Sequence, residues 1–398
     1  MVLIIGAGAS GLMAARHLTT LGIPVRVLEA RDRIGGRICT VSEGFSFPVE
    51  HGAEFVHGDL PLTRSLLRSA GIPMVPAGGR MVRSSSGRWV SSDMFDWERV
   101  LGAMLSLSSD MPLVDFLDRH FASDAATYNA VRGFAEGYDL ADIRFVSTLA
   151  LAREWSREEG AQHRIRGGYG ALIGFLAASV PSIHTGIPVG SISWSQGQVS
   201  AGGFSGDAVL VTVPLGVLQA GAIDFSPALP AYLAASRALG YGTVTKILLE
   251  FERPFWKDAV PGAGFILSDQ PVPTWWTQAP FDTPLLTGWW RGSHPGVDVV
   301  GLSLQSLSGI FGALPPLRAS RVDDWQLDPF SLGAYSYPRV GESPHRALLN
   351  TPVSDTVFFA GEGLYDGDDT PGTVEAALCS GLAAAEKIAA VFAGKARG

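Results

Sequence analysis

Hydrophobic positions along this chain fall into two patterns, short continuous runs and longer segments with helical spacing. Residues 2–5 (VLII) form a continuous run, residues 10–21 form a helix-like segment, and residues 25–28 form a second run. Short continuous runs are typical of parallel strands that are buried on both faces. The N-terminal segment is therefore predicted to be a strand–helix–strand unit.

The same patterns predict elements further along the chain. Residues 356–360 indicate a short buried strand, and residues 373–392 indicate a helix rich in alanine and leucine. Residues 110–143 have helical spacing, whereas KILLEF and TGWWRG are typical of strands in a mixed sheet. We expect loops at residues 84–86, 253–264 and 361–372.

A glycine-rich loop joins the first strand to the first helix. Gly6, Gly8 and Gly11 form G-x-G-x-x-G, and Ser10 lies where the helix starts. These glycines permit a tight turn, a close approach to a pyrophosphate, and packing of helix on strand. The helix start favours phosphate, and Glu29, after the second strand, is placed to bind a ribose hydroxyl. The loop predicts a dinucleotide site but leaves NAD and FAD open.

Basic residues follow this unit directly. In RDRIGGR, Arg33 and Arg37 stand on either side of Gly35 and Gly36. An exposed basic turn is one interpretation. Beside a phosphate loop, however, the arginines look like donors to phosphate oxygens, and the glycines let the backbone pass close to a ligand. An NAD-dependent dehydrogenase has no standard use for this segment.

Length, composition and charge narrow the class of protein. A chain of 398 residues predicts two domains, and 46% hydrophobic residues with 48 glycines suit a packed α/β protein. The formal charge of −8, without a long basic run, argues against a nucleic-acid partner. Cys39 and Cys379 are too few for a disulfide framework. With no 18 uninterrupted apolar residues and a strand starting at Val2, we expect neither membrane anchor nor signal peptide, and a cytoplasmic location.

Several motifs together point to one family. They are GAGASGL, EARDRIGGR, GAEFVHG, RIRGGYGAL, VLVTVPLGVLQ, LGYGTVTKILLEFERPFW, LGAYSY and FFAGE…GTVEAALCSG, and they span residues 2–388. With them the sequence resembles the flavin-containing amine oxidases, a family of monoamine oxidases, polyamine oxidases and flavin-dependent histone demethylases. Its motifs are most similar to those of polyamine-oxidase-like members.

The resemblance implies an α/β protein with FAD as a non-covalent cofactor. A Rossmann-type FAD-binding domain would be assembled from residues 1–75, 160–235 and 345–398. An α+β substrate domain, a mixed sheet flanked by helices, would comprise residues 76–159 and 236–344. Ala334 occupies the position of the cysteine that binds FAD covalently in monoamine oxidases. The flavin should therefore be bound non-covalently and be released when the protein is precipitated with acid.

The resemblance also assigns cofactor contacts. Glu29 would hold the adenosine ribose, Arg37 would lie near the pyrophosphate and flavin, and Val189 would meet the adenine through its backbone. Glu362 would contact the ribityl or pyrophosphate region, and Trp325 would lie beside the flavin. The full set implied is Gly6, Gly8, Ser10, Gly11, Glu29, Ala30, Arg31, Gly35, Gly36, Arg37, Gly52, Ala53, Glu54, Val189, Trp325, Gly361, Glu362, Gly372, Thr373 and Val374.

Three residues are candidates for the chemistry itself. Lys246 lies in an apolar strand, and the resemblance makes it the lysine that holds a water near flavin N5; strand alternation could instead turn it to solvent. Tyr335 matches an aromatic residue that borders the substrate amine, opposite Thr373 rather than a second tyrosine. His57 matches a pocket histidine of polyamine oxidases, with a surface histidine as the alternative.

Other clustered residues leave alternatives open. His51, Glu54, His57 and Asp59 invite a metal site, but no further ligand pair supports one. For Glu54 two interpretations are open: it attracts a cationic amine, or it forms hydrogen bonds only to the backbone. The pairs Trp275–Trp276 and Trp289–Trp290 are expected at the substrate cavity, although alternate strand residues cannot all face it. Two interpretations are likewise open for three acids: they line an acidic tunnel, or they are solvated charges on a helix. These acids are Glu136, Asp139 and Asp142.

The implied function is FAD-dependent oxidation of an amine by hydride transfer to flavin N5. The imine would hydrolyse, and O2 would reoxidise the flavin and give H2O2. The alternative is a related flavin desaturase or protoporphyrinogen-type oxidase acting on a non-amine substrate, and a flavin-bound subunit without turnover is a third interpretation. A small-molecule amine and O2 are the expected partners; the sequence specifies neither which amine nor the oligomeric state.

Overall fold

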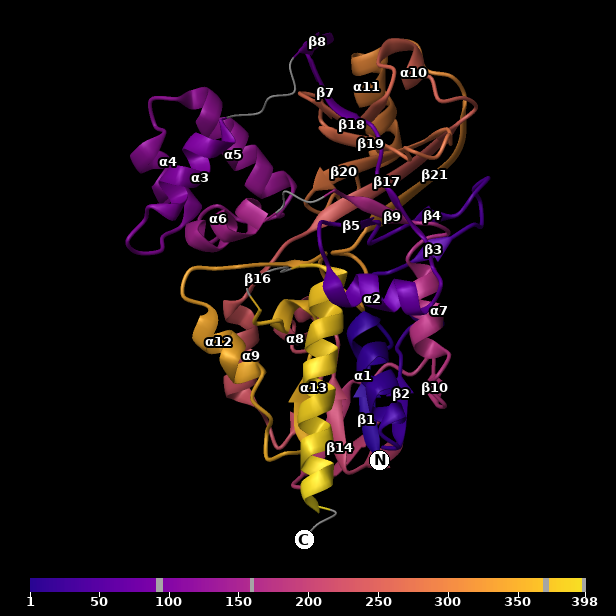
Figure 1. The fold of residues 1–398 in the computed structure, drawn as a ribbon, viewed down its shortest axis with the longest axis vertical. Helices are drawn as coiled ribbons and strands as arrows, with labels where there is room; N and C mark the ends of the chain where they lie inside the picture. Colours follow the sequence, from indigo (N-terminus) through magenta and orange to yellow (C-terminus); the bar gives the residue numbers. More distant parts are fainter. Residues whose placement is uncertain (91–95, 158–160, 368–371, 396–398) are drawn as a thin grey trace.

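The computed structural model describes residues 1–90, 96–157, 161–367 and 372–395. Some predicted segments extend beyond these described residues. They are the loop 361–372 and the domain segments 76–159, 160–235 and 345–398. The fold is mixed α/β, as predicted, with two large sheets at opposite ends of an elongated molecule (Figure 1).

The parallel sheet in the lower half of Figure 1 has the strand order β10-β2-β1-β14-β23. Its strands are β1 (Val2–Ile5), β2 (Val25–Leu28), β10 (Ile183–His184), β14 (Ala208–Val211) and β23 (Val357–Phe359). Every neighbouring pair is parallel. In the central strand β1, Val2 and Ile4 enter one hydrophobic core and Leu3 and Ile5 enter another. Burial on both faces explains the continuous apolar runs in the sequence.

Helices cover one face of this sheet, and a small sheet with further helices covers the other. On the first face, α1 (Ala9–Thr20) packs against both α13 (Val374–Lys395) and α7 (Gly170–Ala177), with α2 (Pro61–Ser69) against α13. The second face carries β11 (Ser191–Ser195), β12 (Gln198–Ala201), β13 (Phe204–Gly206), β15 (Asp224–Ser226), α8 (Leu215–Gln219), α9 (Pro230–Ala238) and α12 (Ser343–Leu349).

A mixed seven-stranded sheet forms the upper half of the molecule. Its order is β21 (Leu317–Asp324), β17 (Val244–Phe251), β20 (Leu285–Arg291), β19 (Thr274–Thr277), β18 (Ala263–Ser268), β7 (Arg80–Ser85) and β8 (Arg88–Val90). Only the β18–β7 pair is parallel among these described pairs. The helices α10 (Trp256–Ala259) and α11 (Val299–Phe311) pack against this sheet.

A separate group of helices stands beside the seven-stranded sheet (Figure 1). It contains α3 (Trp97–Leu105), α4 (Leu113–His120), α5 (Ala125–Gly137) and α6 (Thr148–Arg157), which share a hydrophobic core. Short paired strands link the two halves: β3 (Thr40–Val41) with β4 (Val49–Glu50), β9 (His163–Ile165) with β5 (Phe55–Val56) and β6 (Met74–Pro76), and β16 (Gly240–Tyr241) with β22 (Ser336–Tyr337). The 3-10 helix η1 (Glu362–Leu364) follows β23.

The two sheets draw on different segments of the chain. All five strands of the parallel sheet lie within the predicted FAD-binding segments, and all seven strands of the mixed sheet lie within the predicted substrate-domain segments. The residues at which one domain gives way to the other stay a prediction.

Two predicted loops are wrong in part. Ser84 and Ser85 belong to β7: Ser84 pairs with Ser268 of β18 and is buried, and Ser85 pairs with Arg88 of β8. The segment 253–264 contains α10 and the start of β18. In both cases tertiary pairing and packing outweigh the local turn signals.

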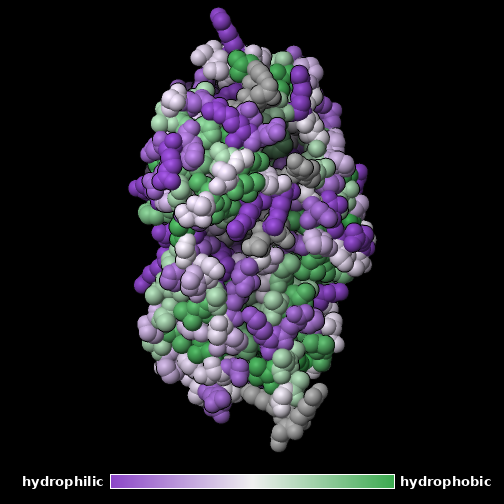
Figure 2. All heavy atoms as spheres, turned by 60° about the vertical axis from the view of Figure 1, so that its left-hand side comes forward, coloured by the Kyte–Doolittle hydropathy of each residue, from purple (hydrophilic) through white to green (hydrophobic). Residues whose placement is uncertain are grey.

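Among the described helices, α13 alone is long and apolar enough to cross a membrane, over Val374–Gly394, by length and composition. In this fold 44% of that window is buried. Leu378, Ala385 and Ile388 belong to the core between α13 and α1, so the helix occupies a core position. On the face shown in Figure 2, hydrophilic and hydrophobic residues are interspersed.

Candidate active site

A cavity of about 810 Å3 lies between the carboxyl ends of the parallel strands and the mixed sheet. It begins where β1, β2, β14 and β23 end, the edge of a parallel sheet at which ligands usually bind. Except for Gly11, this cavity is lined by the full set of cofactor contacts that the resemblance implies and by the three candidates for the chemistry. Residues far apart in sequence are therefore brought to one site.

The phosphate-binding loop has the geometry that its glycines predict. Gly6 has a φ of +107°, and a Cβ on Gly11 would lie 2.1 Å from the Gly6 carbonyl oxygen. Gly11 thus serves helix packing rather than the cavity surface. Gly8 provides no side-chain cap for α1, and the buried Ser10 Oγ has no hydrogen-bond partner among the described residues. Free donors at a helix start, with an unpartnered hydroxyl, fit a phosphate group.

Glu29, the residue predicted to bind the adenosine ribose, also lines the cavity. Glu29 is 3% exposed, and its carboxylate accepts hydrogen bonds from the backbone N–H of Ala7 at 2.7 Å and of Arg31 at 2.9 Å. Arg31 forms an ion pair with Asp328 at 2.6 Å. Val189, whose backbone is predicted to meet the adenine, also lines the cavity. The carboxylate is thus fixed by the backbone while it faces the cavity.

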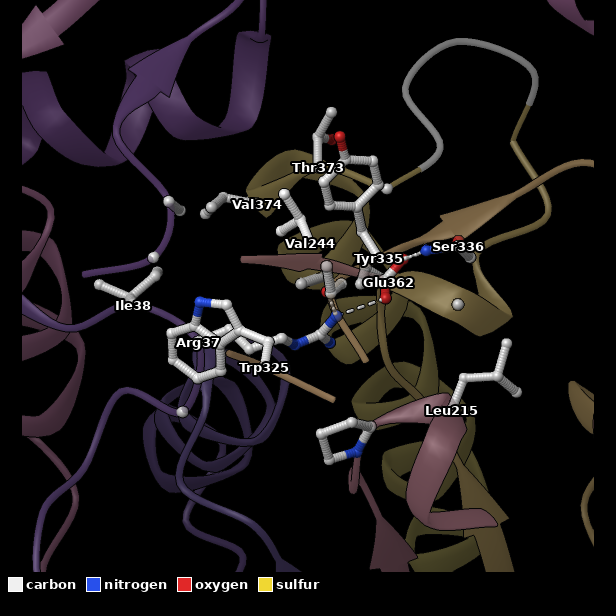
Figure 3. A pocket seen from close by; sticks show the side chains of 18 of the residues that line it. Arg37, Ile38, Leu215, Val244, Trp325, Tyr335, Ser336, Glu362, Thr373 and Val374 are labelled. Carbon is white, nitrogen blue, oxygen red and sulfur yellow. Dashed lines mark hydrogen bonds and ion pairs between the residues drawn. The ribbon is translucent and has the colours of Figure 1, made fainter. Parts of the chain in front are cut away.

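Arg37 and Glu362 join the two ends of the chain at the cavity. Their side chains form an ion pair at 2.7 Å, and the Ser336 hydroxyl donates to the second Glu362 oxygen at 2.7 Å (Figure 3). Arg37 also donates to the carbonyl oxygen of Ala334. Arg33, in contrast, does not line this cavity; its guanidinium lies 3.3 Å from two backbone carbonyl oxygens, so its predicted role as a phosphate donor is wrong.

Backbone at two glycines approaches the cavity closely. A Cβ on Gly52 would lie 1.8 Å from the Arg37 carbonyl oxygen and 3.2 Å from the Trp325 ring, so glycine is required. Gly372 has a φ of +71°, and the Thr373 hydroxyl accepts from the Ala376 N–H at the start of α13. In Figure 3, Thr373 lies beside the Tyr335 ring, with Val374 toward the Arg37 side.

Lys246 is held in the cavity wall by a buried carboxylate. The side chain is 1% exposed, because β17 is buried along its whole length; the solvent-facing interpretation is wrong. Its Nζ donates to the Gly52 carbonyl oxygen at 2.9 Å and to Glu54 Oε2 at 2.6 Å. Glu54 also accepts from Arg164 and from Trp276 Nε1 at 3.0 Å. Burial raises the pKa of Glu54, but the Lys246 and Arg164 cations outweigh it and lower the pKa to about 2.

His57 lies in the same cavity and not on the outer surface. Its Nδ1 is 3.3 Å from the Tyr138 hydroxyl, and the Tyr335 hydroxyl donates to the Tyr138 carbonyl oxygen. Burial lowers the pKa of His57 to about 4. The imidazole is therefore neutral near pH 7 and acts as a hydrogen-bonding group, so it does not gate charge by titrating there.

Aromatic rings form the wall of the cavity on the mixed-sheet side. The Trp276 and Trp289 ring centroids lie 5.6 Å apart, and Trp289 stacks on Tyr335 at 6.4 Å. Trp275 and Trp290 pack into or against the core behind the sheet, so one member of each tryptophan pair faces away from the cavity. Sequence patterns did not single out four residues that line the cavity, Phe55, Tyr138, Glu154 and Phe265, or Arg164, which contacts Glu54. Alternation with His57 was the signal available for Phe55.

The three helical acids differ in their surroundings. Asp139 lines the cavity, is 6% exposed and accepts from Trp155 Nε1 at 3.2 Å. Glu136 forms ion pairs with Arg132 and Arg291, and Asp142 pairs with Arg144. Only Asp139 of these three faces the cavity.

The four residues considered for a metal diverge. Glu54 binds Lys246, His57 contacts Tyr138, and His51 Nδ1 lies 3.5 Å from Asp323. Asp59 is exposed and lies 3.5 Å from Arg64. In the described part of the chain, no three His, Cys, Asp or Glu side chains gather as metal ligands.

The sequence matches the model of one protein family. That family is described as flavin containing amine oxidoreductase, and the match covers residues 9–87 and 103–389. Polyamine oxidase 2 of Arabidopsis thaliana is 30% identical over 447 residues, covering 97% of this chain and 87% of the relative. Lysine-specific histone demethylase 2 of Homo sapiens is 30% identical over 440 residues, covering 98% and 53%.

Other curated relatives are longer than this chain. The chain spans 30% of the length of lysine-specific histone demethylase 1 homolog 3 of Arabidopsis thaliana, to which it is 29% identical. Among solved structures, putrescine oxidase with bound putrescine has a TM-score of 0.83 at 22% identity, covering 98% of both chains. Cyclohexylamine oxidase from Brevibacterium oxydans has a TM-score of 0.82 at 22% identity, covering 98% and 99%. These two structures show the same fold.

Proposed function

Because this chain belongs to the flavin containing amine oxidoreductase family, we propose that it oxidises a small-molecule amine with O2 as the electron acceptor. FAD is the cofactor. The observation that carries the proposal is the convergence of Lys246, Tyr335 and the predicted FAD contacts on one cavity.

The residues that would hold FAD follow the chain's own geometry. The loop from Gly6 to Ser10 suits the pyrophosphate, Glu29 suits the adenosine ribose, and the Arg37–Glu362 pair lies toward the flavin end. When bound, FAD supplies the two-electron oxidation of the substrate C–N bond and the delivery of those electrons to O2.

The remaining cavity residues suit an amine with an apolar carbon skeleton. Trp276, Trp289 and Tyr335 form an aromatic wall that excludes water and can orient an amine through ring faces. The neutral His57 adds no positive charge that would repel an ammonium group. Burial disfavours a charge on the substrate nitrogen as it does on His57, so the amine would react in its neutral form. Lys246 provides a cation near the predicted flavin position, where it would assist reaction with O2.

Two further cavity residues bear on the substrate. Asp139 and Glu154 bring carboxylates to the helical side of the cavity, a feature that would also accept a second ammonium group. The relatives' names span polyamine oxidase and lysine-specific histone demethylase, and the structural neighbours include putrescine oxidase and cyclohexylamine oxidase. We favour a compact amine because the wall next to Tyr335 is aromatic.

A steady-state assay tests this function. The FAD-loaded protein is supplied in air with cyclohexylamine, benzylamine, putrescine, a longer polyamine and a methylated lysine peptide, and H2O2 and carbonyl product are measured. The proposal expects equal amounts of both products from at least one amine. Turnover of a porphyrinogen or an isolated carbon–carbon bond, with none of the amines oxidised, would instead support the desaturase or protoporphyrinogen-type alternative.

A further inference from the structure

Three buried charges meet at one point of the cavity wall. Glu54 lies between Lys246 and Arg164, and the exposed fractions of the three residues are 8%, 1% and 5%. The carboxylate receives hydrogen bonds from both cations and from Trp276 Nε1, so neither oxygen depends on water. Two cations and one anion leave the cluster with a single positive charge.

Arg164 ties this carboxylate to the mixed sheet. It lies on β9, and its guanidinium also donates to the carbonyl oxygens of Thr277 and Ala279 and to the side chain of Gln278. With its donors engaged on three sides, the guanidinium cannot move without breaking several bonds at once. Glu54 is therefore fixed by a rigid partner.

Lys246 is fixed in turn. Two of its three N–H groups bond to Glu54 and to the Gly52 carbonyl oxygen, and the side chain lines the cavity. One donor is left for the cavity. Gly52 is one of the FAD contacts that the resemblance implies, and its hydrogen bond fixes the position of Lys246 relative to that backbone.

We propose that Glu54 is a positioning residue that keeps Lys246 protonated and aims its remaining N–H into the cavity, with Arg164 holding Glu54 in place. The proposal rests on the function proposed above, in which Lys246 assists the reaction with O2. It gives the lysine one role, a permanent cation, and excludes a role as a proton acceptor.

Other charged groups around Lys246 are few. Glu50 lies within electrostatic reach of it, and Asp323 is its cross-strand neighbour in β21. Asp323 is already engaged by Arg321 at 3.1 Å and lies 3.5 Å from His51. Glu54 is thus the carboxylate in direct contact, and its low pKa keeps it charged throughout the ordinary pH range.

Removing this carboxylate has a specific consequence. In Glu54→Gln, Lys246 and Arg164 remain buried side by side without an anion, and both burial and repulsion oppose the lysine charge. Lys246 would then lose its proton at a lower pH, while the unfolded chain keeps it. Because the unfolded state binds more protons, stability of the variant relative to wild type should rise with pH.

The experiment compares FAD-loaded wild type, Glu54→Gln and Lys246→Met after photoreduction without any amine. Flavin reoxidation by O2 is followed by rapid mixing between about pH 6 and pH 9, and Tm is measured over the same range. Wild type should reoxidise at a rate independent of pH. Lys246→Met should be slower at every pH, by roughly ten- to a thousand-fold. Glu54→Gln should match wild type at low pH and slow by about tenfold or more as pH rises, while its Tm gains on wild type.

Matched variants exclude a merely structural effect. Glu54→Asp keeps the charge and should retain a pH-independent rate. Arg166→Gln removes an exposed arginine two positions from Arg164 and should behave as wild type. If Glu54→Gln fails to load FAD, the double variant Glu54→Gln/Arg164→Gln restores the net charge of the cluster and should still show the pH-dependent rate, displaced to higher pH.

The failures are distinguishable. A pH-independent rate in Glu54→Gln, together with a Tm difference that does not change with pH, would overturn the positioning role. Wild-type reoxidation in Lys246→Met would remove the lysine from the proposed function, while the Tm comparison would still decide whether Glu54 holds its charge. Neither readout requires an amine substrate, so failure to find one leaves both results valid.

Discussion

Glu50 and Glu54 are carboxylates four positions apart whose surroundings drive their pKa values in opposite directions. Glu54 contacts two cations, which lower its pKa to about 2. Burial raises the pKa of Glu50 to about 7, although the Tyr169 N–H donates to it at 2.6 Å and Thr40 at 2.9 Å. Contact with a buried cation, and not burial itself, separates the two residues.

Glu50→Gln should remove a pH-dependent loss of stability. The folded protein binds a proton at Glu50 between about pH 4.3 and pH 7, where the unfolded chain does not, so stability falls as pH rises through this range. The variant lacks this loss. From about pH 5 to pH 8 it should gain on wild type by roughly 1–3 kcal/mol. Denaturant titrations of the FAD-loaded proteins measure the gain, and parallel curves for the two proteins would contradict it.

Glu29→Ala should weaken FAD binding and leave chemistry in the remaining holoenzyme largely intact. The carboxylate is buried in the cavity wall, at the end of β2, and faces the predicted ribose position. Loss of a charged hydrogen-bond partner costs on the order of 1.5–3 kcal/mol. Titration of the apoprotein with FAD measures the affinity, with the exposed Glu43→Ala as control. Equal affinities in both variants would refute the ribose assignment.

At the scale of elements, the sequence predicted structure best where burial is simple. The unit β1–α1–β2 and helix α13 are confirmed, because a strand buried on both faces and a long apolar helix leave unambiguous patterns. Ser84 and Ser85 were misassigned, because their strand pairs with distant β18 at Ser84 and with β8 at Ser85. Alternation predicted that the two tryptophan pairs cannot all face the cavity, and the structure shows that Trp276 and Trp289 do.

One element depends on a side chain from another. The start of α2 has Leu60 as its cap residue, which provides no side-chain bond. Glu375 of α13 accepts from the N–H groups of Leu62 at 2.8 Å and Thr63 at 2.7 Å instead. This buried carboxylate therefore caps a helix about three hundred residues away and binds α2 to α13.

Glu375→Ala should destabilise the protein by about 2–4 kcal/mol, because it leaves two helix donors and a threonine hydroxyl without their acceptor. Thermal unfolding of the FAD-loaded protein measures the loss. Glu386→Ala removes an exposed carboxylate from the same helix and should change stability little. An equally small effect of Glu375→Ala would show that water replaces the cap.

At the scale of the whole molecule, the site exists only because distant segments meet. The Arg37–Glu362 and Glu54–Arg164 pairs each join parts of the chain more than one hundred residues apart. Resemblance placed Arg37, Glu54 and Glu362 in the site, but the partner of Lys246 could not be found from spacing, because no local pattern encodes which buried charges neutralise one another. The predicted cytoplasmic location and the absence of a nucleic-acid partner stay predictions.

The assembled cavity also predicts how FAD is retained. Ala334 lines it at the position where monoamine oxidases have their linking cysteine, and neither Cys39 nor Cys379 lines it. Acid precipitation of the yellow protein should release free FAD into the supernatant. Flavin that stays with the denatured chain would show a covalent bond.

Direct reduction by substrate tests the central claim, that this cavity brings an amine to FAD. The FAD-loaded protein is mixed with each amine of the panel under anaerobic conditions while flavin absorbance is followed. We expect that at least one amine bleaches the flavin without O2, and that admitting O2 restores the colour with formation of H2O2. A flavin that dithionite reduces but that every amine leaves oxidised would contradict the account.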